Sequence, residues 1–280
     1  MASTEKKYYI ALLFTLCSIL FFLPYEESSS ALVQGDTQID SSEEINQPQV
    51  VPPQLKGKYD YIEITASCGP DFEGHCISAY SGPGVQYKKL YELRSGMIFK
   101  IKNKEEKNGQ VWYRVYFDEH LRYPDRVEGD WYIPAVAGRI VTGNGEELLT
   151  SVTPATSKRI IVDLSDHMIY AYDEDGLFLT TKVSTGISSA PTPLGNFTIY
   201  KKMPSRYMQG PIPGVTDSPF DLPGVSWNMY FTEDGAVIHG AYWHDRYGTN
   251  QSAGCINLPP ELSKILYDWA DLGTKVTIEE

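Results

Sequence analysis

The chain has 280 residues and a formal net charge of −12 at pH 7. This acidity argues against nucleic acid and against anionic lipid as electrostatic partners. With four cysteines and five histidines, the chain has few side chains of the two types most often used for nucleophilic catalysis.

The N-terminal segment, residues 1–31, is typical of a targeting signal. Two lysines precede an apolar run that Pro24 ends, and Ser29 and Ala31 supply the small residues that a signal peptidase needs. The run is shorter than the ~20 apolar residues that cross a bilayer comfortably. We therefore expect a cleaved signal peptide, with an uncleaved N-terminal anchor as the alternative, and an exported protein in either case.

Residues 32–56 are poor in aromatic side chains and rich in Gln, Ser, acidic residues and Pro. Such a composition buries too little apolar surface to become ordered, so we expect a disordered linker. Two modest domains fit into the rest of the chain.

Residues 57–138 alternate short β-type runs with Gly-rich turns, which predicts a small all-β domain. The stretch SGPGVQYKKLYELRSGMIF, followed by GDWYIPA, resembles the bacterial SH3-like domains. The resemblance implies a small β-barrel, and members often bind cell-wall peptide. A structural spacer without a ligand is the alternative.

The stretch SCGPDFEGHC brings Cys68 and Cys76 within a turn-rich loop of this domain. An exported protein experiences oxidising conditions, which favour a disulfide between them. A metal site with His75 is the alternative, but it has no fourth ligand nearby, so we expect no metal. Since Cys17 lies in the N-terminal apolar run, Cys255 is left without a partner.

Residues 157–280 are again rich in β-type runs and end in one amphipathic helix, PPELSKILYDWADLG, before a last strand. The fold class is thus mainly β. The Pro-, Gly- and Met-rich stretch 203–225 reads as a loop or flap over a groove, with Arg206 as a candidate to bind carboxylates. Trp227 and Tyr230 after it are expected in the core.

Cys255 could be a nucleophile or a buried inert thiol, and the residues alone leave both open. Gly254 before it leaves the backbone accessible, and His239 at the end of a short strand could serve as its base. The loop between them offers Tyr242 and Trp243 as an aromatic wall for an elongated substrate. His244 in the same loop is expected to contact substrate or to be exposed to solvent.

This region resembles the catalytic domain of the L,D-transpeptidases (the YkuD family). The family pattern is matched by His239-Gly240, by the segment SAGCIN that starts at Ser252, and by the upstream VSTG and PTPLGNFTIY. The resemblance implies a β-sandwich domain that acts on the tetrapeptide stems of peptidoglycan, in the cell wall or at the outer face of the cytoplasmic membrane. It implies no cofactor.

The resemblance also implies a role for each matching residue. Cys255 attacks the stem, releases D-alanine and forms a thioester, which an amine of a second stem converts into a 3→3 cross-link. His239 is the general base and acid, and the Gly240 carbonyl orients it. Gly254 and Ser252 belong to the oxyanion and substrate site, and Asn257 braces the cysteine turn.

Ala253 departs from the family, which usually has His at this position. Losing one oxyanion-type donor can lower the rate by ~10²–10³. The alternatives are therefore a catalytically impaired wall-binding protein and, with water in place of the amine, an L,D-carboxypeptidase. A papain-like peptidase is disfavoured because its nucleophile precedes its base, whereas His239 precedes Cys255.

Overall fold

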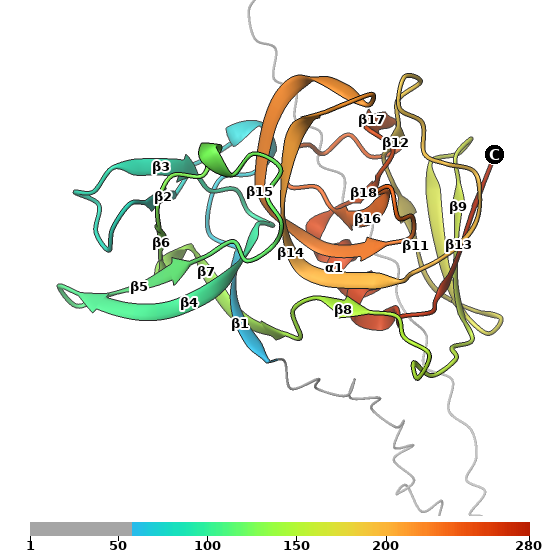
Figure 1. The fold of residues 1–280 in the computed structure, drawn as a ribbon, viewed down its shortest axis with the longest axis horizontal. Helices are drawn as coiled ribbons and strands as arrows, with labels where there is room; N and C mark the ends of the chain where they lie inside the picture. Colours follow the sequence, from blue (N-terminus) through green and yellow to red (C-terminus); the bar gives the residue numbers. More distant parts are fainter. Residues whose placement is uncertain (1–57) are drawn as a thin grey trace, which may run out of the picture. The chain divides into compact units, whose positions relative to one another are not determined.

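The computed structural model describes residues 58–280. The expected signal segment 1–31 and linker 32–56 lie outside the described residues. The mainly β fold class is confirmed: strands dominate the described residues, and their single α-helix is α1, Pro260–Trp269 (Figure 1). This helix is too short to span a membrane.

The N-terminal part forms one seven-stranded sheet in the order β3-β2-β6-β5-β4-β1-β7 (Figure 1). Its strands are β1 (Tyr59–Ile64), β2 (Ser78–Tyr80), β3 (Lys89–Glu92), β4 (Ile98–Lys107), β5 (Gln110–Val115), β6 (Trp131–Pro134) and β7 (Gly138–Gly143). Three single-turn 3₁₀ segments accompany them: η1 (Pro70–Phe72), η2 (Pro124–Arg126) and η3 (Ala135–Ala137). The all-β character of this part agrees with its sequence, and the SH3-like barrel stays a prediction.

The C-terminal part contains two five-stranded sheets and a short parallel pair. One sheet has the order β11-β10-β9-β19-β13, the other β18-β16-β15-β14-β8, and β12 pairs with β17. The strands of the first sheet are β9 (Lys158–Asp163), β10 (Met168–Asp173), β11 (Gly176–Lys182), β13 (Gly195–Thr198) and β19 (Lys275–Glu279). The others are β8 (Glu147–Leu148), β12 (Thr185–Gly186), β14 (Lys201–Ile212), β15 (Thr216–Tyr230), β16 (Val237–Gly240), β17 (Asn250–Ser252) and β18 (Ile256–Leu258).

A single core joins these two sheets, as expected for a β-sandwich. Ile160 and Val276 from the first sheet, Trp227 and Ile238 from the second, and Leu266 of α1 belong to one cluster of buried residues. Burial of this apolar surface provides the main favourable term in folding. Trp227 thus lies in the core, as predicted.

The stretch 203–225 is not a loop. It lies in β14 and β15, which pair as a long antiparallel hairpin that turns at residues 213–215. The prolines misled the prediction because a proline in a ladder normally breaks it. Here Pro204, Pro211 and Pro223 all fall at positions without a ladder partner, two of them where the register shifts or the pairing skips.

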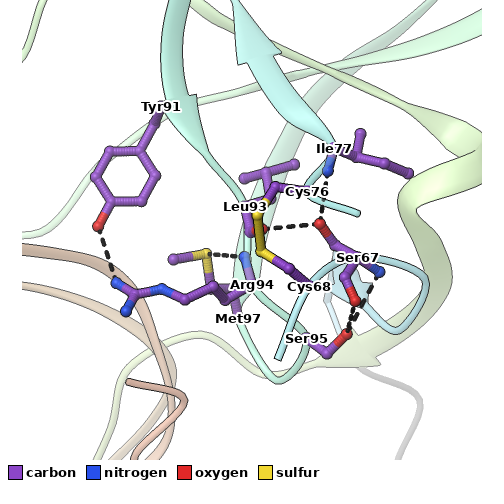
Figure 2. The surroundings of a disulfide bond; sticks show 9 residues. All are labelled: Ser67, Cys68, Cys76, Ile77, Tyr91, Leu93, Arg94, Ser95 and Met97. Atoms are coloured by element: carbon purple, nitrogen blue, oxygen red, sulfur yellow. Dashed lines mark hydrogen bonds between the residues drawn. A yellow bond between two sulfur atoms is a disulfide. The ribbon is translucent and has the colours of Figure 1, made fainter. Parts of the chain in front are cut away.

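The disulfide between Cys68 and Cys76 is confirmed, with their Cα atoms 4.5 Å apart (Figure 2). Ser67 beside it bridges two strands' worth of backbone: its hydroxyl donates to the Leu93 carbonyl at 2.8 Å and accepts from the Ile77 N–H at 2.8 Å. The bridge therefore closes a loop that hydrogen bonds already tie to the sheet. Within residues 58–280 no group of His, Cys, Asp and Glu side chains is arranged to hold a metal ion.

Candidate active site

Cys255 sits on a sharp turn between β17 and β18. Gly254 before it has a φ of +103°, a conformation that side chains disfavour, so the turn needs glycine at this position. The Ser252 hydroxyl closes the turn by donating to the Cys255 carbonyl at 2.5 Å. Among the described backbone hydrogen bonds, neither the Gly254 N–H nor the Cys255 N–H has an acceptor. Two donors are thus left for a ligand beside the thiol.

His239 lies on β16, the parallel neighbour of β18, where it stands opposite Asn257. This register explains how residues sixteen positions apart in sequence come to the same place. The His239 Nδ1 atom lies 3.1 Å from the Gly240 carbonyl oxygen. Because a carbonyl only accepts, Nδ1 carries the proton, and Nε2 keeps the lone pair that a base needs.

Both groups are uncharged at neutral pH. Burial raises the pKa of the Cys255 thiol to about 11, opposed by a backbone hydrogen bond from Val237. Burial lowers the pKa of His239 to about 4, opposed by its bond to Gly240. No hydrogen bond joins the thiol to the imidazole in the described structure, so the resting site holds a thiol and a neutral base rather than an ion pair.

A groove of about 690 Å³ opens over this pair. The cysteine turn, the segment 187–193 and the β14–β15 hairpin all contribute to its lining. The predicted site residues that line it are Cys255, His239, Gly254, Ser252, Trp243, Arg206 and Asn257. The stretch 203–225 therefore does cover the groove, although as a hairpin.

Two aromatic predictions fare differently. Trp243 lines the groove with its ring centre 5.6 Å from that of His239. Tyr242 does not reach it: only 1% of its surface is exposed, and its hydroxyl donates to the Pro223 carbonyl at 2.8 Å. Neighbouring residues in this extended segment point in opposite directions, so only one ring of the pair can face the groove.

His244 is neither exposed nor part of the groove lining. It is 2% exposed, and its Nε2 atom lies 3.0 Å from the Asn257 Nδ2 atom. Asn257 also exchanges two backbone hydrogen bonds with Ser184, at 2.9 and 3.0 Å. The residue after the cysteine turn is thus held from both its main chain and its side chain.

Sequence reasoning missed two residues of the groove. Tyr230, expected only in the core, also lines the groove and packs in one cluster with Cys255 and Met203. Arg122 lines the same groove although it belongs to the segment between β5 and β6. No local signal marks Arg122, because it lies more than a hundred residues before the cysteine turn.

Comparison with known proteins agrees with this geometry. Residues 157–278 match the family model of the L,D-transpeptidase catalytic domain, YkuD. The chain is 31% identical over 116 residues to "Probable L,D-transpeptidase 3" of Mycobacterium tuberculosis, which covers 39% of this chain and 41% of that protein. The chain thus spans about two fifths of this curated relative's length.

Solved structures give similar matches. The catalytic domain of an E. faecium L,D-transpeptidase is 29% identical, with 43% of this chain and 95% of that chain covered and a TM-score of 0.39. An L,D-transpeptidase from Mycobacterium smegmatis is 18% identical, with 61% and 91% covered and a TM-score of 0.42. The part of the chain that carries His239 and Cys255, residues 157–278, thus matches the L,D-transpeptidase catalytic domain of the YkuD family.

Proposed function

We propose that the protein is an exported, cysteine-dependent L,D-transpeptidase that acts on peptidoglycan tetrapeptide stems and forms 3→3 cross-links. The observation that carries this proposal is the adjacency of β16 and β18, which brings a histidine with a free Nε2 and an unpaired cysteine into one groove. The family match of residues 157–278 supports the choice of substrate.

Acylation begins from the neutral pair. As the Cys255 sulfur attacks the carbonyl at the L-centre of the diamino acid, its proton passes to the His239 Nε2 atom. The carbonyl oxygen becomes negative and is held by the free N–H groups of Gly254 and Cys255. Collapse of this intermediate breaks the bond to D-alanine, whose amine takes the proton from His239, and leaves a thioester on Cys255.

Deacylation reverses the roles of these groups. A side-chain amine of a second stem attacks the thioester, and His239 accepts a proton from it. The sulfur leaves and recovers a proton from His239, which restores the thiol and completes the new amide bond. Water in place of the amine gives the L,D-carboxypeptidase reaction, which is the second candidate.

Export is part of the proposal. It rests on the N-terminal sequence and on the Cys68–Cys76 disulfide, a bond that persists in oxidising compartments. A possible N-terminal anchor is the one membrane attachment proposed. The SH3-like identity of residues 57–138, and a catalytic domain at 157–280, are proposed on the sequence resemblance.

Intact-protein mass spectrometry after incubation with a disaccharide-tetrapeptide tests the reaction. We expect a mass gain equal to the stem minus D-alanine, absent in Cys255→Ala and His239→Ala. His120→Ala, an exposed histidine outside the groove, is the matched control and should acylate like the wild type. A folded wild-type protein that gains no mass with stems of several diamino acids would refute the enzyme and leave a wall-binding protein.

A further inference from the structure

We propose that Arg122 and Arg206 together form a carboxylate-binding subsite of the groove, and this inference rests on the proposed function. Arg206 lies on β14, in the wall of the groove, while Arg122 comes from the segment between β5 and β6. The N-terminal part of the chain would then supply a substrate contact directly, whatever else it binds.

The charge balance of the groove supports a subsite for an anion. Neither Arg122 nor Arg206 forms an ion pair within residues 58–280, although four other described arginines do: Arg114, Arg126, Arg139 and Arg159. Asp234 is the single acidic residue in the described lining of the groove. In a chain of net charge −12, two unpaired guanidinium groups on one groove are a local exception.

The position of Arg122 is set by hydrogen bonds on both sides of it. The Glu119 Oε1 atom accepts the Tyr207 N–H at 2.6 Å. The Tyr123 N–H donates to the Gln209 Oε1 atom at 2.8 Å, and Gln209 Nε2 donates back to the Tyr123 carbonyl at 3.0 Å. The segment that carries Arg122 is therefore fastened to β14 at two points next to Arg206.

Further contacts hold the same segment at the tip of the hairpin. The Tyr123 hydroxyl donates to the Pro211 carbonyl at 2.7 Å, and the Arg126 guanidinium donates to the Gly210 carbonyl at 2.5 Å. Gln209 also donates to the Asp221 Oδ1 atom of β15 at 2.9 Å. Arg122 is thus presented from an anchored segment, which lowers the entropic cost of using it for binding.

Glu119 could compete for Arg206, since its charge is felt there. Its Oε1 atom already accepts the Tyr207 N–H, and burial raises the pKa of this carboxyl group. It therefore does not take the place of an external anion.

The chemistry of two guanidinium groups selects a carboxylate, which each can bind through paired N–H donors. A stem tetrapeptide offers two sources: the C-terminal carboxylate of its last residue and the carboxylates of its internal residues. Amidation of one or the other removes the negative charge with little change in shape. Comparing the two amidated peptides therefore identifies the source.

Calorimetric titration of the full chain carrying Cys255→Ala tests the subsite without any turnover. The ligands are a stem tetrapeptide with all carboxylates free, the same peptide amidated at its C-terminus, and the same peptide amidated internally. Arg122→Gln and Arg206→Gln are made in this background. Arg246→Gln, an exposed arginine that neither lines the groove nor forms an ion pair, is the matched control.

We expect Arg206→Gln to weaken binding of the free peptide about tenfold and the more exposed Arg122→Gln about threefold. Amidation at the bound carboxylate should weaken binding to a similar degree and abolish the effect of both substitutions. Equal losses for free and amidated peptides, no losses, or a loss with Arg246→Gln as well would overturn the subsite. Absence of wild-type acylation would instead refute the proposed reaction, whatever the titrations show.

Discussion

Alkylation of Cys255 as a function of pH reports on how the resting site stores its proton. A thiol with a pKa of about 11 is ionised in about one molecule in 10⁴ at pH 7, against about one in 10² at the ordinary value of 9.0. Because His239 has a pKa of about 4, it carries no charge that could hold a thiolate at neutral pH. The alkylation rate should therefore rise about tenfold with each pH unit from 6 to 10, since iodoacetamide reacts with the thiolate.

The assay is iodoacetamide labelling of the full chain, followed by quantitation of the peptide that contains Cys255. Site-resolved detection separates this cysteine from Cys17, and Cys68 and Cys76 are protected by their disulfide. Replacing His239 by Ala should leave the slope of the pH profile unchanged. A rate that is constant between about pH 6 and pH 9 would reveal a thiolate–imidazolium pair and refute the neutral resting state.

Three further predictions concern stability. Acid should destabilise the fold through His239: its pKa falls from 6.5 unfolded to about 4 folded, so stability present above pH 6.5 is lost as the pH falls to 4, by about 3 kcal/mol. Urea unfolding at both pH values should show a smaller loss in His239→Gln. Lys202→Met should cost about 2 kcal/mol in urea unfolding, because the buried ammonium group donates to the Tyr267 and Ala270 carbonyls at 2.8 and 2.5 Å. Removing the Cys68–Cys76 disulfide, which spans eight positions, should lower the free energy of unfolding by about 2.5 kcal/mol.

Each of these has a matched comparison. Lys201→Met, at the more exposed neighbouring lysine, should cost clearly less than Lys202→Met, and equal costs would contradict the helix-end role. The disulfide variant should keep its acylation rate at 25 °C, because the bridge lies outside the groove lining. An acid loss of equal size in His239→Gln would show that other groups dominate.

Local sequence was sufficient wherever a feature depends on neighbours in the chain. The helix α1 begins at Pro260, inside the expected stretch, because proline suits the first turn and the apolar spacing is helical. The turn before Cys255 was recognisable because only glycine accepts a φ of +103° without strain. The loop closed by Cys68 and Cys76 was recognisable for the same reason, since its ends are only eight residues apart.

Prediction failed where long-range pairing decides. Strands β14 and β15 contain prolines that argue against a ladder, yet the prolines fall where the ladder has no partner, and that register exists only once the hairpin has formed. His244 looked exposed in a polar loop, but its partner Asn257 lies on a different strand. Tyr242 and Trp243 have the same character in sequence, and packing against Pro223 turns one away from the groove.

The sequence by itself determined the mainly β class, the disulfide, the helix and the pair of reactive residues, because each follows from composition, spacing or a short motif. The tertiary structure alone decided that β16 lies beside β18, that burial keeps both reactive groups neutral, and that Arg122 reaches the groove. Burial and proximity depend on segments far apart in the chain, so no local pattern encodes them.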